Sequence, residues 1–340
     1  MNNEEEIPLQ HNSGKTPKPS AGKSNSEANT EPEMRMEAHP VDLGSVMGKS
    51  TNNEEFLRQL LELPEEKLIP WEECTLPSKG IYYNWPDGVV MVRAMGQAAE
   101  KVLATQRLAQ TGQSIDYLFR ECCKFPNGFD PADLLLGDRV FLLYYLRGIT
   151  HGNMYEFMIS CPQCENIGTH KYDLNDLATT IKWADASLGK EPFKVVLPYM
   201  SKATNREVFV GLRYLRATDA NEMISQRKFR KQNFSRPANS VRSGALPSQR
   251  MRAKQETTLD ETVTENLEKM IVSVMGVTDL MAIKAFVQKL HSTDTATIRE
   301  WMRDNSPGID TTVLITCPSC DHEFRAELPI SENFFRPVKS

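Results

Sequence analysis

The sequence predicts an α+β protein that combines short β-hairpins with amphipathic helices. Three observations predict this class. Apolar residues recur at helical spacing in several stretches. The β-prone runs are short and end at turn residues. Two Cys-Pro-x-Cys turns, far apart in the chain, each lie between two such runs. We therefore expect an N-terminal β-hairpin with helices, a split β unit built on the cysteine turns, and an inserted β-hairpin with a helical bundle.

Composition and charge narrow the functional classes. The 340 residues predict two or three domains, and 40% hydrophobic with 25% charged residues is typical of a soluble globular protein. The net charge of −5 gives no general attraction to nucleic acid or membrane. There is no apolar run of membrane-span length and no signal-peptide core, and the odd number of cysteines suits a reducing compartment. We expect a protein of the cytoplasm, or of a particle assembled there.

Residues 1–50 are rich in Asn, Ser, Lys, Glu, Pro and Gly and poor in large apolar side chains. Such a segment cannot offset its ordering entropy by burial, so we expect a disordered tail. Its run Gly44-Ser-Val-Met-Gly48-Lys49-Ser50 has three residues between the glycines, where a phosphate loop has four, and no β-strand precedes it. Residues 54–63 then predict a short amphipathic helix, which docks on its own domain, the interpretation we favour, or on a partner.

The first folded domain is expected at 51–152, where the helix at 54–63 is followed by one hairpin and three further helices. In chain order these are a hairpin of residues 81–83 and 89–93 around the tip Trp85-Pro-Asp-Gly88, and helices at 97–110, 114–123 and 133–148. The helix at 133–148 is apolar on nearly all sides, which places it in the core. Asp138 and Arg139 interrupt its apolar surface, and a buried pair, an interface contact and solvent exposure all stay open for them.

Two short cysteine turns carry the strongest chemical signal. Cys161-Pro-Gln-Cys164 and Cys317-Pro-Ser-Cys320 each lie between β-prone runs, so the same strand–turn–strand unit occurs twice, at 153–175 and 309–332. Together Cys161, Cys164, Cys317 and Cys320 supply four thiolates, which is the ligand set of a closed, tetrahedral structural Zn²⁺ site. We predict that these two ribbon halves share one zinc ion.

Other interpretations of the cysteines are weaker. Two disulfides are not expected in a chain without a mark of secretion. A redox pair would need one motif to open a helix, whereas both lie between strands. His170 and His322 follow the turns closely, but four thiolates complete the ligand shell without them.

The distance between the turns is the unusual feature, since about 150 residues separate Cys164 from Cys317, where compact ribbons have about 15–20. Closing so long a loop costs about 4–5 kcal/mol, and structural zinc contributes on the order of 10 kcal/mol in small fingers. A metal can therefore hold the two halves together. With four protein ligands such a site has no open position for a substrate, which favours a scaffolding role.

An inserted domain is expected between the ribbon halves, at 176–308. Its predicted elements are strands at 193–197 and 207–216 around a polar turn, a helix from about 219 to 232, and helices at 258–274, 279–291 and 295–303. Short connections between the last helices suit a small antiparallel bundle.

A basic run without an acidic residue crosses this insert, and its second half lies in an expected mobile loop at 233–256. One interpretation is a solvated helix end followed by a linker. The other is a contact with an anion, nucleic acid or an acidic protein face. The basic side chains are Arg227, Lys228, Arg230, Lys231, Arg236, Arg242, Arg250, Arg252 and Lys254.

The motifs of known catalytic sites are absent from the sequence: it has no nucleophile elbow, no HExxH and no dinucleotide fingerprint. We therefore expect a non-enzymatic protein without a small-molecule substrate.

The order of several motifs resembles a known family. These are Leu76-Pro-Ser-Lys-Gly80 with Ile81-Tyr-Tyr83, Val92-Arg93-Ala-Met95, Glu100-Lys101, Asp116-Tyr-Leu118, Asp133-Leu-Leu-Leu-Gly137-Asp138-Arg139, the first cysteine turn and Tyr172-Asp-Leu174. Together they resemble the baseplate hub and tail-assembly proteins of contractile-tailed bacteriophages of the T-even type.

The resemblance implies a structural or assembly component of the baseplate. Its partners would be other tail or baseplate proteins, and it would be found in the host cytoplasm during assembly or in the virion. The alternative from the residues themselves is a zinc-ribbon regulator that binds nucleic acid through 227–254.

Overall fold

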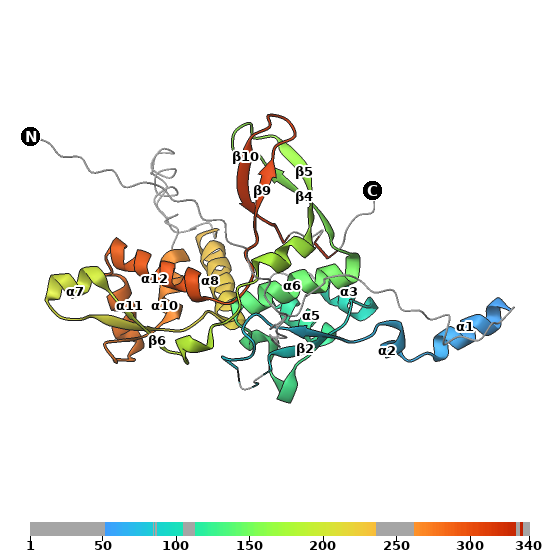
Figure 1. Ribbon diagram of the computed structural model, residues 1–340, viewed down its shortest axis with the longest axis horizontal. Coiled ribbons are helices and arrows are strands. Elements are labelled where there is room, and N and C mark those ends of the chain that lie inside the picture. The colour runs from blue at the N-terminus through green and yellow to red at the C-terminus, as the bar shows by residue number, and fades with distance from the viewer. Residues whose placement is uncertain are drawn as a thin grey trace, which may run out of the picture. The chain divides into compact units, whose positions relative to one another are not determined.

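The computed structural model describes residues 52–83, 85, 87–104, 113–235, 262–330 and 334–335, of which 104, 127 and 227–235 are described by the backbone alone. Helices and small antiparallel sheets follow one another along the chain (Figure 1), which confirms the α+β class. The predicted tail at 1–50 and most of the loop at 233–256 lie outside the described residues. No helix in the described ranges is long and apolar enough to cross a bilayer.

The N-terminal part contains helices α1 (Asn53–Glu62) and α2 (Glu65–Leu68) and a three-stranded sheet. This sheet has the order β1 (Glu72–Thr75), β2 (Val89–Val92) and β3 (Cys123–Lys124), with antiparallel pairing throughout. Asn52 caps α1 by accepting a hydrogen bond from the Glu54 N–H.

The hairpin predicted from residues 81–83 and 89–93 is wrong in its first strand. Strand β2 pairs with β1 instead, and residues 81–83 lie in a turn. The Leu76 N–H closes the intervening loop on the Gly88 carbonyl, and Tyr83 directs its hydroxyl to a buried carboxylate of the core. The backbone of residues 81–83 forms turn hydrogen bonds instead of strand pairs, from the Ile81 N–H to the Ser78 carbonyl and from the Tyr83 N–H to the Gly80 carbonyl.

Helix α6 (Leu136–His151) is the buried centre of the first part, as its all-round apolar surface predicts. It begins three residues later than expected, because Pro131–Asp133 forms a 3₁₀ turn capped by Asp130. It ends at Gly152, where φ is +80°. Helices α3 (Gln97–Ala104) and α5 (Ser114–Cys122) pack against each other beside it.

The insert is built around a second sheet with the order β6–β7–β8. Its elements are 3₁₀ helices η3 (Leu174–Thr180) and η4 (Ala186–Leu188), β6 (Phe193–Val196), α7 (Pro198–Thr204), β7 (Phe209–Leu212), α8 (Ala217–Ser235), α10 (Thr262–Met270), β8 (Ile271–Val274), α11 (Leu280–Val287) and α12 (Ser292–Asn305). Residues of β6, β7, α10, α11 and α12 share one apolar core, to which Leu135 also contributes.

Two elements of the insert differ from expectation. The helix predicted over 258–274 ends at Met270, and the β-branched run Ile271–Val274 pairs with β7. The polar turn predicted between the first two strands contains the short helix α7, which starts at Pro198. In both places the spacing of apolar residues suits either a helix or a strand. Contacts with the neighbouring sheet determine which of the two forms.

The insert leaves and rejoins the rest of the chain at one point. Lys182 and Gly308 exchange two backbone hydrogen bonds of 2.8 and 3.0 Å. The start of α6 is tied to the insert as well, since the Leu136 N–H donates to the Leu215 carbonyl and the Ala217 N–H to the Leu134 carbonyl. Backbone bonds thus close the neck of the insert independently of any metal.

Candidate metal centre

Two antiparallel hairpins carry the cysteine turns. Strands β4 (Met154–Ser160) and β5 (Ile167–Asp173) pair over their full lengths, as do β9 (Thr312–Thr316) and β10 (Glu323–Glu327). The sequence predicts both hairpins, because each turn lies between two β-prone runs. In Figure 1 the two hairpins lie side by side, although one follows α6 and the other closes the chain.

The two turns have the same local geometry. In the first, the Cys161 N–H donates to the Asn166 carbonyl and the Glu165 N–H to the Cys161 carbonyl. The second repeats both bonds, from Cys317 to His322 and from Asp321 to Cys317. The residue after the second cysteine of each turn is left-handed, with φ of +57° at Glu165 and +54° at Asp321. Each turn therefore presents its two thiols in the same way.

The structure brings all four predicted thiols together. Cys161 Sγ lies 3.8 Å from Cys320 Sγ, and Cys164 Sγ lies 3.7 Å from Cys317 Sγ. All four sulfurs lie within 4.8 Å of one another. Zinc–sulfur bonds of about 2.3 Å in a tetrahedron place the sulfurs about 3.8 Å apart. The four cysteines therefore fit a Zn²⁺ ion, which would supply the cross-link between the two hairpins.

The surroundings of the cluster favour the thiolate form at Cys317, whereas they raise the pKa of the Cys320 thiol to about 12. The Ser319 N–H points at Cys317 Sγ, 3.4 Å away, and it lowers the pKa of this thiol to about 7. Cys161 and Cys317 are buried, whereas Cys164 and Cys320 are exposed. The sulfur cluster is thus partly open to solvent at one side.

The two turns also contact each other directly. The Asn166 side-chain amide donates to Ser319 Oγ, and a Cβ added at Gly168 would lie 3.1 Å from the ring of Pro318. The histidines near the turns do not join the cluster. His170 packs beside Phe157 and His322 stacks on Phe324.

Apolar side chains form a base under the sulfur cluster. Tyr155 and Phe157 of β4 and Val313 and Ile315 of β9 are all buried, and they alternate with exposed residues. The Tyr155 hydroxyl donates to the Pro329 carbonyl at 2.6 Å. Because successive side chains of a strand point to opposite faces, this alternation places the apolar residues of each hairpin on one inner face. The same alternation can be recognised in the sequence.

The C-terminal aromatic pair fixes the ribbon to the helical part. Phe334 is fully buried, and its ring centre lies 5.1 Å from those of both Tyr144 and Tyr155. Tyr144, on α6, also donates its hydroxyl to the Leu328 carbonyl at 2.8 Å. A chain segment after β10 therefore connects the ribbon with the central helix.

A second constellation lies at the first turn of α6. The Asp138 carboxylate accepts hydrogen bonds from the Ser78 N–H at 2.9 Å and the Tyr83 hydroxyl at 2.7 Å. Arg139 forms a buried ion pair with Asp116. These partners come from the very motifs on which the family resemblance rests. Three of those motifs, which are far apart in the sequence, therefore meet at one place in the fold.

The glycine of the same motif has a packing role. A Cβ added at Gly137 would lie 1.9 Å from the Pro307 carbonyl oxygen, at the end of the insert. The Gly137-Asp138-Arg139 run thus contacts three separate segments at once. Asp138 and Arg139 are 0% and 5% exposed, and they bind different partners rather than each other. Both side chains therefore make contacts inside the fold, and we do not propose them as an interface with a partner.

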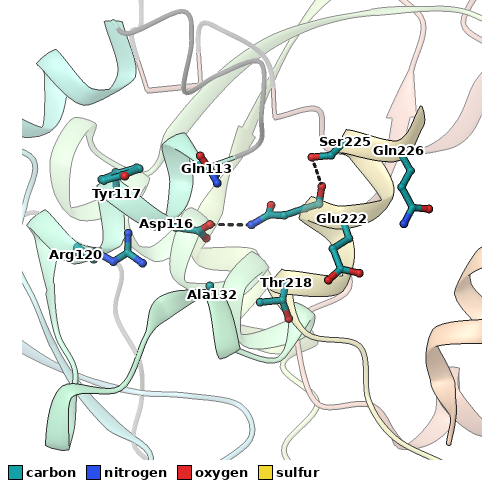
Figure 2. Close-up of a pocket in the computed structure, with 10 residues that line it drawn as sticks. Gln113, Asp116, Tyr117, Arg120, Ala132, Thr218, Glu222, Ser225 and Gln226 are labelled. Carbon is teal, nitrogen blue, oxygen red and sulfur yellow. Dashed lines mark hydrogen bonds between the residues drawn. The ribbon is translucent and has the colours of Figure 1, made fainter. Parts of the chain in front are cut away.

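A polar pocket of about 500 Å³ lies between α5 and α8, next to the Arg139–Asp116 pair (Figure 2). Asp116 accepts a hydrogen bond from the Asn221 side-chain amide across it at 2.8 Å. Tyr117 and Arg120 lie on the α5 side of the pocket, and Glu222 lies on the α8 side. The charged groups that line the pocket form ion pairs within the chain: Arg120 pairs with Asp130, and Glu222 pairs with Lys269.

Comparison with known families identifies the chain. A model of the family described as T4 bacteriophage base plate protein matches residues 73–336. The chain belongs to this family. No curated protein and no solved structure matches the chain. The matched region contains the α6 constellation and both cysteine turns of this baseplate protein, and it starts after α1 and α2.

The remaining predicted site residues lie beyond the described side chains of this baseplate protein. Arg227, Lys228, Arg230 and Lys231 belong to the last turns of α8, where the structure describes the backbone alone, and Arg236 lies outside the described residues. Sequence reasoning missed Ser78, Tyr83 and Asp116 as partners of the α6 turn. The signal that marks them is their presence in the resemblance motifs.

Proposed function

We propose that this chain is a non-enzymatic scaffold of the bacteriophage tail baseplate hub, held together by one structural Zn²⁺ ion. The observation that supports the metal most strongly is the set of four thiols from two distant hairpins at the spacing of a tetrahedral zinc site. The family match supports the baseplate role.

The zinc would act as a clasp between the halves of the chain. We assign residues 51–152 to a helical domain, 153–175 with 309–332 to the zinc ribbon, and 176–308 to the insert. The ribbon halves are separated by the whole insert, whose neck is closed by the Lys182–Gly308 bonds. A closed four-thiolate site adds rigidity without offering a substrate position, which is the property that a scaffold needs.

The partners in this proposal are other phage tail or baseplate proteins. The protein would act in the host cytoplasm during assembly and would occur in the virion if it stays in the finished baseplate. The nucleic-acid alternative is not favoured, because it depends on the basic segment 227–254, and the family is one of baseplate proteins.

The test combines genetics with quantitative mass spectrometry. Phage deleted for this gene is complemented by the wild-type chain, by Cys317→Ser, or by the control Cys74→Ser, whose buried thiol lies outside the cluster. We expect the deletion and Cys317→Ser to give particles without functional baseplates, and the control to restore the infectious titre. A normal titre from the deletion would contradict the baseplate role, and full complementation by Cys317→Ser would contradict the clasp.

Copy number in purified particles then distinguishes the two baseplate roles. A fixed small copy number per particle identifies a structural subunit. Abundance in the infected-cell lysate together with absence from particles identifies an assembly factor that leaves before maturation.

A further inference from the structure

The sulfur cluster combines exposed and buried thiols in pairs that cross from one hairpin to the other. Cys164 is exposed, and its Sγ lies 3.7 Å from Sγ of the buried Cys317 on the other hairpin. Cys320 is exposed as well, and its Sγ lies 3.8 Å from Sγ of the buried Cys161. Each pair therefore holds one thiol that a small oxidant can reach from solvent and one that is shielded behind it.

The three cysteines outside the cluster have different surroundings. Cys74, Cys122 and Cys123 are all buried in the helical part of the chain. Burial raises the pKa of each of these thiols, which keeps them in the unreactive protonated form. Among the seven cysteines, only the cluster thus offers thiols to an oxidant in solution.

We propose that the cluster is a redox-sensitive clasp, in which oxidation joins Cys164 to Cys317 and Cys161 to Cys320 as disulfides. This inference rests on the proposed zinc clasp and states how the same site responds to an oxidising environment. Both disulfides connect the two hairpins that the metal would connect. The cross-link between the hairpins therefore survives loss of the metal.

The oxidation of each pair takes two steps and consumes one molecule of hydrogen peroxide. The four sulfurs are thiolates when they bind a metal. First, the exposed thiolate attacks a peroxide oxygen, the O–O bond breaks, hydroxide leaves, and the sulfur becomes a sulfenic acid. The facing thiolate then attacks that sulfur, the S–O bond breaks, and a second hydroxide leaves as the S–S bond forms. The two sulfurs together lose two electrons, and the peroxide gains them.

Contacts between the two turns favour this pairing. The Asn166 side-chain amide donates to Ser319 Oγ, and Gly168 lies against the ring of Pro318. These contacts do not involve the metal, so they keep the cross-hairpin sulfurs opposite each other when the metal leaves. An S–S bond is about 2 Å long, so the sulfurs of each pair need to approach by only about 1.7 Å.

The alternative pairing, within each turn, has the opposite consequence for the fold. A disulfide between Cys161 and Cys164 closes a single turn, and so does one between Cys317 and Cys320. Neither bond connects the hairpins, so oxidation of that kind would open the clasp. The two pairings are therefore distinguished by whether the hairpins remain covalently joined.

The proposed baseplate role gives this chemistry a setting. The host cytoplasm keeps thiols reduced, and the metal would hold the hairpins together there. A released particle has left that reducing compartment, and disulfides persist outside it. A clasp that changes from a metal to disulfides stays closed in both environments.

Disulfide mapping of the full chain by mass spectrometry, before and after excess hydrogen peroxide, tests the proposal. Trypsin releases the first cysteine turn in peptide 148–171 and the second in peptide 304–325. Cross-hairpin disulfides join the two peptides, whereas disulfides within the turns leave them separate. We expect peroxide to release zinc and to join the peptides, with fragmentation showing Cys164 bound to Cys317. The three buried cysteines outside the cluster should stay reduced and serve as an internal control.

Melting in the presence of EDTA measures whether the disulfides replace the metal. The oxidised chain should keep its melting temperature in EDTA, whereas the reduced chain should melt at a lower temperature. The control Cys74→Ser, which leaves the cluster intact, should behave as wild type in both states.

Three results would overturn the redox clasp even in a chain that binds zinc. These are separate peptides with disulfides inside each turn, cluster thiols that stay reduced in excess peroxide, and an oxidised chain that melts like the reduced chain in EDTA. An untreated wild-type chain without zinc would instead contradict the proposed function. The same two peptides would still report how the cysteines of that chain pair.

Discussion

Asp138 shows how one buried carboxylate can connect distant parts of a chain. It is fully buried, and it accepts hydrogen bonds from the Ser78 N–H and the Tyr83 hydroxyl. Tyr83 in turn accepts a hydrogen bond from the Leu135 N–H, just before α6. Burial raises the pKa of Asp138 to about 6, although both hydrogen bonds act in the opposite direction. The ionised carboxylate is therefore less stable in the folded protein than in the unfolded chain.

This shift predicts a pH dependence with a definite sign. Below about pH 4 Asp138 is neutral in both states, and between about pH 4 and pH 6 the unfolded chain loses the proton first. The wild-type protein should therefore lose about 3 kcal/mol of unfolding free energy relative to Asp138→Asn over this window, with no further change above it. Urea unfolding of both proteins at pH 4–8 measures the difference. A difference that does not vary with pH would contradict the account.

The residues of this constellation were partly predictable. The sequence marks Asp138 and Arg139, because charges interrupt an apolar helix there. It does not give their partners, because Ser78 and Asp116 are brought near by tertiary packing over 60 and 23 residues. A single sequence contains no signal for such pairings beyond the recurrence of family motifs.

At the scale of elements, the first turn of α6 depends on a close approach that only glycine allows. Alanine ordinarily favours a helix over glycine by roughly 1 kcal/mol. We expect Gly137→Ala to destabilise the protein by about 1–3 kcal/mol instead, because its Cβ would overlap the Pro307 carbonyl. Thermal or urea unfolding measures the change. A neutral or stabilising effect would show that the insert's end can move away without loss.

The attachment of the ribbon to α6 predicts that Phe334 contributes strongly to the stability of the fold. Phe334→Ala empties a fully buried site between Tyr144 and Tyr155, and we expect a loss of about 3–5 kcal/mol. Phe56→Ala changes an aromatic residue that is 46% exposed on α1, and its effect should stay within about 0.5 kcal/mol. Equal effects in the two variants would contradict the anchoring role of Phe334.

The predicted helices and strands agree with the structure where one face of the element is apolar. The predictions are wrong where pairing with a neighbouring strand determines the secondary structure. The helix α6 and both cysteine hairpins follow from periodicity. Strand β8 does not, because Ile271–Val274 continues the helical spacing of α10 and becomes a strand by pairing with β7. Residues 81–83 likewise do not pair with β2, because their backbone forms turn hydrogen bonds and β1 takes the place beside β2.

At the scale of the whole molecule, more than one contact holds distant segments of the chain together. The Lys182–Gly308 backbone bonds close the neck of the insert, and Phe334 holds the end of the ribbon. A zinc ion held by the four cysteines would add a cross-link at the tip of the two hairpins. Loss of the metal should therefore loosen the ribbon and lower the melting temperature without unfolding the entire chain. The cysteine pattern predicted this pairing of distant segments, whereas the neck and the aromatic anchor came from the structure.

The most direct test of the clasp is the metal content of the purified full chain, measured by native mass spectrometry together with its melting temperature. We expect one zinc ion per wild-type chain and one in the control Cys122→Ser, whose thiol lies outside the cluster. Cys161→Ser and Cys317→Ser should lose the ion and melt at a lower temperature. A wild-type chain without zinc after expression in zinc-supplemented medium, or variants that keep both the ion and the melting temperature, would contradict the central claim.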